Sequence, residues 1–315
     1  MTRTARRWAA AVLLGSVAVV GAGVLAPRAW RRLRPPPPRP AAAPEVPFGR
    51  IYQIDERLWV IPGGGGNTAV FLTSHGVVVI DPKLPAFGPQ VLEEIRRVTD
   101  QPIALAITTH SHNDHFGGVL AMEKHVPVVM HERTARNIAK LRGTGNPAEL
   151  DGHPVRTFDE SLTLFEGPDQ IELRYFGPAH TDGDVVVVIK AFGVMHAGDL
   201  FRAKRNPIIN LPWGGSPSEF PVTLAHAVNG IHGVSRVITG HADVVPWQVF
   251  VEYSQFVELL VRHGRAQMDA GRTWNDAVAS FAPPAPFSDY DLRTLPNTMQ
   301  DIYKGATPWW KVWVR

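Results

Sequence analysis

Short apolar runs alternate with amphipathic segments along most of the chain from Ile51 onward. Runs rich in Val, Ile and Leu that are bounded by Gly, Pro or polar residues are typical of strands. We predict strands at 51–61, 69–73, 77–80, 103–107, 128–130, 162–165, 171–176, 185–189, 194–196 and 236–238. Helical periodicity predicts helices at 90–99, 132–141, 218–231 and 249–270. Strands followed by helices occur twice, which predicts two sheets covered by helices on the outside.

Local signals set the ends of some of these elements. Ser218 and Thr273 stand at N-cap positions, Thr273 before a further short helix. The run Gly63–Gly66, followed by Asn67, separates two predicted strands. It is not a phosphate-binding loop, because no Gly-Lys-Ser/Thr follows and no helix begins there. We expect a flexible hairpin tip, with a mobile flap over a site as the functional alternative.

The first 47 residues differ in composition from the rest. Arg3, Arg6 and Arg7 precede an uncharged, mostly apolar run over 8–26, the pattern of an export signal or of an uncleaved membrane anchor. We predict an export signal or anchor at 1–34, a proline-rich linker at 35–47 and one globular domain at 48–315. The domain would then be periplasmic, secreted or anchored to the outer face of the cytoplasmic membrane. At the other end, Trp309, Trp310 and Trp313 suggest a short edge strand.

Composition excludes several kinds of chemistry. The chain has no cysteine, which rules out disulfides, zinc–thiolate sites, iron–sulfur clusters and thiol nucleophiles. Any metal site must therefore use His, Asp or Glu. The net charge is +3, but eight arginines precede Pro40 without an acid, so the remainder has a net charge of −5. An acidic body argues against nucleic-acid binding and leaves a small molecule as the expected partner.

The densest group of chemically active side chains lies at 108–115, Thr-Thr-His-Ser-His-Asn-Asp-His. It places three imidazoles, of His110, His112 and His115, and the carboxylate of Asp114 within six residues. Crowding such groups together is costly unless a cation neutralises and binds them. We therefore interpret this stretch as part of a metal site.

Three further residues have the same position relative to a predicted strand. His180, Asp199 and His241 each follow an apolar strand after a glycine-containing break, as the histidine cluster does. The carboxyl ends of strands in a layered α/β fold share one rim, where ligands bind. Four strands can therefore bring seven candidate ligands together, although these span more than a hundred positions.

This set resembles the metallo-β-lactamase-fold hydrolase superfamily, with its His-x-His-x-Asp-His signature, a later Gly-x-x-His, an Asp after a strand and a final Gly-His. Asp81, in Val-Val-Val-Ile-Asp-Pro, matches the early strand-end aspartate of that family. The resemblance extends from about Ile51 to Val245. It implies an α/β fold, a four-layer αββα sandwich with two metal ions at the edge between the sheets.

The resemblance also implies a ligand set. One metal would be held by His110, His112 and His180, and the second by Asp114, His115 and His241. Asp199 would bridge the two, and Asp81 would orient a ligand imidazole without binding a metal. Two Zn²⁺ ions suit these ligands, with Fe or Mn as alternatives because ligand identity alone does not fix the metal. Water at such a site becomes a hydroxide nucleophile, and Asp114 would orient it or pass a proton to the leaving group.

The substrate is less well defined. Lactam-cleaving members commonly have Cys or Ser where this chain has Asp199, whereas an aspartate there resembles glyoxalase II, lactonases and other ester or thioester hydrolases. We expect an exported hydrolase of a small ester, lactone, thioester or amide. A zinc β-lactamase and a non-catalytic metal-binding protein on the same fold are the alternatives. The oligomeric state is not determined by the sequence.

Other residues have weaker signals. His196 is expected to be a buried, hydrogen-bonded side chain, and Phe116 a core residue. Asp182 and Asp184 suit either a turn or a supporting role next to His180. Trp213 is the candidate for a wall of the substrate pocket.

Overall fold

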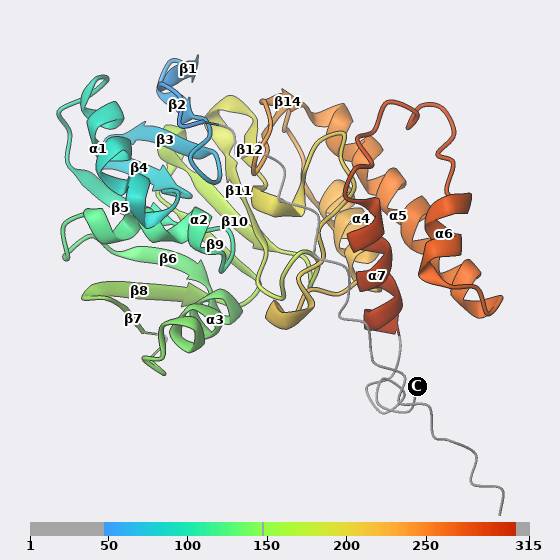
Figure 1. Ribbon diagram of the computed structural model, residues 1–315. Helices are drawn as coiled ribbons and strands as arrows, with labels where there is room; N and C mark the ends of the chain where they lie inside the picture. Colours follow the sequence, from blue (N-terminus) through green and yellow to red (C-terminus); the bar gives the residue numbers. More distant parts are fainter. Residues whose placement is uncertain (1–46, 147, 307–315) are drawn as a thin grey trace, which may run out of the picture. The chain divides into compact units, whose positions relative to one another are not determined.

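The computed structural model describes residues 47–146 and 148–306, which form two β-sheets flanked by helices (Figure 1). The first sheet has, in spatial order, β1 (Tyr52–Asp55), β2 (Leu58–Ile61), β3 (Thr68–Thr73), β4 (Gly76–Ile80), β5 (Ile103–Ile107), β6 (Val128–His131), β8 (His153–Phe158) and β7 (Glu149–Leu150). Strands β1 to β4 are antiparallel, whereas β4, β5, β6 and β8 run parallel.

The second sheet is mostly antiparallel. Its spatial order is β14 (Val245–Pro246), β13 (Arg236–Ile238), β12 (Val194–His196), β11 (Val185–Ile189), β10 (Ile171–Tyr175) and β9 (Ser161–Leu164). Only β12 and β13 pair in parallel within it. The ends of these two strands therefore lie at the same rim.

Helices cover the outer face of each sheet (Figure 1). The helices are α1 (Gly88–Arg96), α2 (Asn113–Phe116), α3 (Glu132–Arg142), α4 (Phe220–Gly230), α5 (Trp247–Asp269), α6 (Trp274–Ser280) and α7 (Leu295–Ala306). Helices α1 and α3 pack on the first sheet, and α4 to α7 form a shared core on the side of the second. The four-layer αββα sandwich predicted from the sequence is confirmed.

The alternation of side chains along single strands produces these layers. In β4, Val77 and Val79 face the helical side, while Val78 and Ile80 face the other sheet. Every residue of β11 is buried, because one face meets the first sheet and the other meets the helices. Each fully buried Val contributes about 1.5–3 kcal/mol. The continuous Val-Val-Val-Val-Ile run is therefore what a strand covered on both faces requires.

Several predicted boundaries differ from the structure. The run 51–61 is two strands joined by a tight turn, not one. Ser218 does not cap α4, whose N-cap is Glu219, and Pro221 occupies the first turn. Thr273 does cap α6, in a reciprocal capping box with Asp276. Helices α2 and α7 and strands β7, β8 and β14 were not predicted. Strands β7 and β14 have two residues each, α2 has four and β8 has few apolar residues, whereas α7 is an amphipathic helix of 12 residues that the sequence analysis missed.

The glycine run also differs from its prediction. It does connect two antiparallel strands, β2 and β3, as a hairpin tip would, but Gly63–Gly66 and Asn67 are buried. Gly63, Gly64 and Gly65 have φ of 68°, 63° and 102°, a region that glycine adopts without strain. The segment thus folds back into the protein.

Some predictions fall on residues outside the described ranges. These are the export segment, all but the last residue of the proline-rich linker, and the strand expected around Trp309, Trp310 and Trp313. Within 47–146 and 148–306, no helix combines the length and apolar character needed to cross a membrane.

Candidate metal centre

Loops at one rim of the sandwich carry the candidate ligands. His110 and His112 follow β5, and His180 follows β10. Asp199 lies in a 3₁₀ turn, Gly198–Leu200, directly after β12, and His241 follows β13. The strand ends predicted from the sequence are thus the positions from which these side chains converge.

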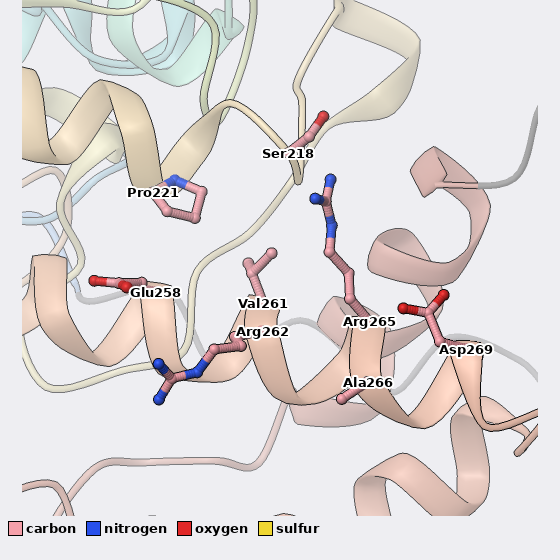
Figure 2. Close-up of a pocket in the computed structure, with 8 residues that line it drawn as sticks. All are labelled: Ser218, Pro221, Glu258, Val261, Arg262, Arg265, Ala266 and Asp269. Carbon is pink, nitrogen blue, oxygen red and sulfur yellow. The ribbon is translucent and has the colours of Figure 1, made fainter.

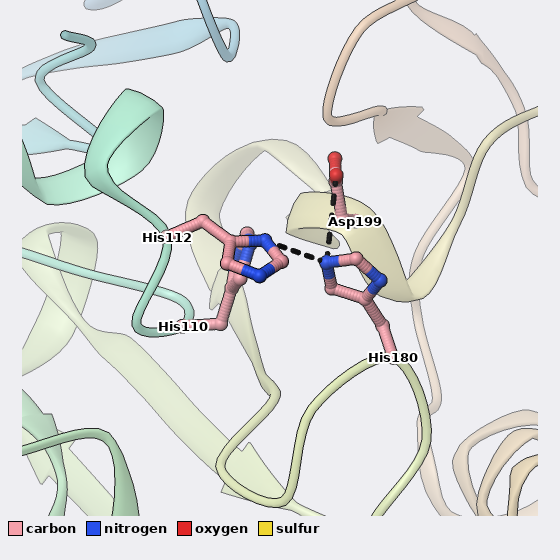
Figure 3. A group of neighbouring side chains, drawn as sticks. All are labelled: His110, His112, His180 and Asp199. Atoms are coloured by element: carbon pink, nitrogen blue, oxygen red, sulfur yellow. Dashed lines mark hydrogen bonds and ion pairs between the residues drawn. The ribbon is translucent and has the colours of Figure 1, made fainter. Parts of the chain in front are cut away.

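Three histidines and one aspartate form a first group (Figure 3). One ligand atom from each of His110, His112, His180 and Asp199 lies within 4.8 Å of all the others. His112 Nδ1 is 3.0 Å from His110 Nε2 and 2.9 Å from His180 Nε2. Asp199 Oδ2 is 3.6 Å from His180 Nε2. Three imidazoles and a carboxylate oxygen therefore surround one point.

A second group lies next to the first. It contains Asp114, His115 and His241, again with ligand atoms within 4.8 Å of one another. His241 Nε2 is 3.3 Å from both Asp114 Oδ2 and His115 Nε2. Asp199 Oδ1 is 3.1 Å from His241 Nε2, while its Oδ2 faces the first group. One carboxylate thus contacts both groups, as a bridging ligand would.

The outward-facing ring nitrogens are held by other protein groups. Thr109 Oγ1 lies 3.1 Å from His110 Nδ1, and the carbonyl of Ile208 lies 2.9 Å from His180 Nδ1. The side-chain amide of Asn210 lies 2.6 Å from His112 Nε2. These contacts fix the ring orientations and leave the inward nitrogens free to bind an ion.

Asp81 plays the same part for the second group. Its Oδ2 lies 2.7 Å from His115 Nδ1, and its two oxygens also accept hydrogen bonds from the backbone N–H and hydroxyl of Thr109. The side chain is fully buried, and it is not in either group of candidate ligands. An orienting role would use this contact, and that role of Asp81 stays a prediction.

The electrostatics differ between the groups. Burial, reinforced by neighbouring imidazoles, lowers the pKa of His110 well below its ordinary value and that of His112 to about 3. Neutral imidazoles are the form that binds metals. Burial also opposes a charge on His241, but the carboxylates of Asp199 and Asp114 outweigh it and raise its pKa to about 10. The second group therefore favours positive charge.

The residues present fit a pair of metal ions. Asp199 Oδ1 is buried and makes no hydrogen bond of regular geometry, although Nε2 of His241 and Nε2 of His115 lie 3.1 and 3.5 Å from it. A buried carboxylate oxygen that faces imidazole nitrogens without a regular hydrogen bond is well satisfied by a cation bound between them. A set of imidazole and carboxylate ligands without thiolates also suits zinc and related divalent ions.

Most residues that the sequence analysis set aside are placed as expected. His196 is buried, with Nε2 3.0 Å from the carbonyl of Asn67. Phe116 is fully buried in the core beneath α1 and α3. Asp184 accepts hydrogen bonds from the backbone and hydroxyl of Thr181, and Asp182 accepts one from Asn137, so both organise the turn after His180.

Three residues near the site were missed from the sequence. Asn210 contacts the ring of His112, Lys83 lies buried behind the second group, and Asn67 binds the loop that carries His241. In the sequence, only their closeness to motif residues could have pointed to them, because a single Asn or Lys in a loop is too common to predict a role. Trp213 is half-buried in the same loop as Asn210, and its role as a pocket wall stays a prediction.

Two surface cavities lie apart from this centre, because no candidate ligand lines either of them. One, of about 380 Å³, lies between α4 and α5, where Arg265 extends towards Ser218 (Figure 2). The other, of about 500 Å³, lies beside His75 and Phe165 at the turn between β3 and β4. The second cavity lies at the beginning of β4, whereas the metal centre lies at the end of that strand. The cavity is therefore at the opposite rim of the sheet.

Comparison with known proteins supports the interpretation of the two ligand groups as a metal centre. The model of the metallo-beta-lactamase superfamily matches residues 61–229. A metallo-beta-lactamase type 2 from Bacillus sp. (strain 170) is 20% identical over 203 residues, which cover 62% of this chain and 76% of that protein. A similar protein from Elizabethkingia meningoseptica is 22% identical over 216 residues, covering 63% of this chain and 81% of that protein.

Solved structures share the fold. A metallo-beta-lactamase from Pontibacter korlensis has a TM-score of 0.56 and 22% identity, covering 66% of this chain and 98% of that one. A stereoselective inverting sec-alkylsulfatase from Pseudomonas sp. has a TM-score of 0.65 and 15% identity. That match covers 85% of this chain, which spans about half (52%) of the sulfatase.

The fold and the site together define a metal-dependent hydrolase. The chain belongs to the metallo-β-lactamase superfamily, as the family model matches more than half of its length. The enzyme class predicted from the sequence is confirmed.

Proposed function

We propose that this protein is an exported hydrolase that uses two metal ions, most suitably zinc, to cleave a small ester, lactone, thioester or amide. The observation that carries the proposal is the carboxylate of Asp199, one oxygen of which faces each ligand group. Bound zinc would act as a Lewis acid and lower the pKa of a water molecule so that it attacks near neutral pH. The remaining steps fall to side chains of this chain.

Asp114 is the side chain best placed to move a proton. About 27% of it is exposed at the rim, whereas His115 beside it is fully buried. Burial opposes ionisation of Asp114, yet His115 and His241 outweigh burial and lower its pKa to about 2. Asp114 is therefore a carboxylate at neutral pH, able to orient the attacking water, to accept a proton from it and then to pass that proton to the leaving group.

The type of substrate follows from the bridging position. An aspartate there resembles the arrangement of ester and thioester hydrolases, and this is why we place lactam cleavage second. The β-lactamase alternative has support of its own, since the chain matches several proteins described as metallo-beta-lactamases at 20–22% identity. Turnover of a chromogenic cephalosporin distinguishes the two.

Metal content and turnover test the proposal together. We expect two metal ions per chain by mass spectrometry, with hydrolysis of members of an ester, lactone and thioester panel that a chelator abolishes. Asp199→Ala should lose at least one ion and most activity, while His226→Ala, on the exposed side of α4, should behave like the parent protein. Fewer than one ion per chain, or turnover that chelators leave untouched, would contradict the proposal.

Export is supported by the N-terminal sequence alone. Arg3, Arg6 and Arg7 followed by the apolar run 8–26 would direct the chain to the membrane, with the hydrolase domain on its outer side. Fractionation of expressing cells and N-terminal sequencing of the mature protein separate a cleaved signal from a retained anchor. Recovery of unprocessed protein solely in the cytoplasm would refute export.

A further inference from the structure

Lys83 is a buried, positively charged side chain that has no role in the proposed reaction. The side chain is fully buried, and its Nζ donates to the carbonyls of Ile61, Gly63 and Gly66 at 2.7, 2.6 and 2.8 Å. The ammonium forms no ion pair with a described carboxylate. A buried charge without a counter-ion is costly, so this position needs an explanation.

The three carbonyls define what the ammonium does. An ammonium has three N–H donors and no acceptor. The three carbonyls therefore accept one hydrogen bond from each N–H of Lys83, and no donor is left unpaired. Burial lowers the pKa of Lys83 to about 7, against an opposing effect of Asp81. A neutral amine has one donor fewer, so the charged form is the one that holds all three carbonyls. Lys83 thus occupies a carbonyl cage formed by one short segment.

That segment would be loose without a fixed point. It contains the glycines Gly63 to Gly66, and glycine loses more conformational freedom on ordering than any other residue. Two of the carbonyls in the cage belong to the glycine run and the third closes the strand before it. One side chain therefore holds three points along this segment.

The far end of the segment contacts all three residues of the second ligand group or their loops. The N–H of Gly66 donates to the carbonyl of Asp114 at 2.9 Å. A Cβ on Gly66 would lie 2.4 Å from Cε1 of His115, so the backbone packs directly on that ring. Asn67 donates from its backbone to the carbonyl of Gly240 at 2.7 Å.

The side chain of Asn67 extends this last contact. Its amide donates to the carbonyls of Thr239 and Ala242, at 2.9 and 2.7 Å, on either side of His241. The histidines of the first group are held by other residues, namely Thr109, Asn210 and Ile208. The segment over 61–67 therefore supports one group selectively.

We infer that Lys83 is a positioning residue for the second metal ion: it fixes the segment 61–67, which in turn places Asp114, His115 and His241. The inference rests on the two-metal function proposed above. It requires that losing the ammonium weakens the second metal site and spares the first.

Metal titration of Lys83→Met tests this directly, since Met keeps an unbranched side chain only one atom shorter but removes the three donors. Metal-free protein is titrated with Co²⁺ against a competing chelator, and each site is followed by the paramagnetically shifted NMR signals of its own histidine rings. The parent protein should bind two ions. In Lys83→Met, the second affinity should fall at least tenfold, in the range for loss of a residue that supports a ligand, and the first should stay within about threefold.

The control is Lys190→Met, which removes a partly exposed lysine whose partner is Glu172. It should leave both affinities unchanged. A folded Lys83→Met protein with two unchanged affinities, or with both lowered equally, would overturn the inference while leaving the proposed function intact. A parent protein that binds a single ion would instead overturn the proposed function, and the inference with it.

Two further measurements cover the case in which Lys83→Met does not fold. Asn67→Ala removes the contacts at the other end of the segment and should also weaken the second site selectively; equal loss at both sites counts against the inference. In the metal-free parent protein, the amide hydrogens of Gly66 and Asn67 should exchange slowly. Rapid exchange there would show that the segment is not fixed before metal binds, which would overturn the inference.

Discussion

Asp81 shows how one residue can support a site that it does not itself form. It has a φ of 54°, a left-handed conformation that costs a non-glycine residue about 1–3 kcal/mol. The carboxylate accepts two hydrogen bonds from Thr109 and lies 2.7 Å from the ring of His115. These contacts offset the backbone strain and fix both the histidine-rich loop and one ligand ring.

Asp81→Asn should therefore weaken metal binding without unfolding the protein. The amide keeps the shape of the side chain but offers one acceptor oxygen where the carboxylate offers two. We expect metal affinity to fall by about 10- to 100-fold, the range for loss of a group that orients a ligand. Competition with a chelator measures this, with Asp159→Asn, at an exposed position, as the control. Unchanged affinity would show that Asp81 is dispensable for ligand placement.

At the scale of elements, the helices illustrate that a cap depends on geometry as well as residue type. Thr273 accepts a hydrogen bond from the N–H of Asp276, whose side chain in turn accepts from Thr273 N. Ser218 lies two residues before α4, and its hydroxyl forms a hydrogen bond with the hydroxyl of Ser216. Both side chains can accept a hydrogen bond from a helix amide, but only Thr273 is at the N-cap position of its helix.

This difference predicts different effects of the same substitution. Thr273→Ala should lower the free energy of unfolding by about 1 kcal/mol, because it leaves an N-terminal amide of α6 unpaired. Ser218→Ala should change the same quantity by less than about 0.5 kcal/mol. Urea unfolding of both variants measures the two values. Equal losses would mean that the hydroxyl of Ser218 contributes a contact that the structure does not show.

On the scale of the whole molecule, the two sheets are tied together at the rim opposite the metal centre. Asp169, between β9 and β10, forms an ion pair of 2.5 Å with Arg57 from the turn between β1 and β2. It also accepts hydrogen bonds from the backbone and hydroxyl of Ser74. A single carboxylate of the second sheet therefore links two hairpins of the first.

This link should make stability depend on pH. Burial opposes ionisation of Asp169, but the hydrogen bonds from Ser74 and Arg57 outweigh it and lower its pKa below the ordinary value. A lowered pKa in the folded state stabilises the protein above the unfolded-state value of about 3.9, and the gain disappears as the pH falls through the folded-state pKa. Asp169→Asn should thus cost about 1.5–3 kcal/mol at pH 7 and progressively less below pH ~4.

Urea unfolding of the parent protein and the variant between pH 2.5 and pH 7 measures this difference. Asp100→Asn, at an exposed position, provides the matched loss of charge and should show no such trend. A constant difference across the range would assign the effect of Asp169 to packing rather than to its charge.

Removal of metal should destabilise the whole molecule as well as inactivate it. An ion at a thousandfold excess over its dissociation constant stabilises the folded state by about 4 kcal/mol. A chelator should therefore lower the thermal unfolding midpoint of the parent protein by several degrees. His112→Ala should start from a lower midpoint and respond less. Identical shifts in both proteins would point to an effect of the chelator unrelated to this site.

The sequence determined a large part of this protein. Most strands and the helices α1, α3, α4 and α5 followed from apolar periodicity, because buried strands and amphipathic helices leave regular patterns. The candidate ligands could be identified because seven His and Asp residues follow strand ends, and the absence of cysteine restricted them to imidazoles and carboxylates. These signals are local, so a linear reading detects them.

Only the tertiary structure decided how those residues are supported. Lys83 is buried because three carbonyls from a distant segment surround it, and Asn210 meets His112 across 98 positions of sequence. The glycine run was predicted to be a flexible hairpin tip, yet it is buried and packs on His115. Such contacts leave no periodic trace, because they depend on where loops meet in space, and chain folding alone brings those loops together.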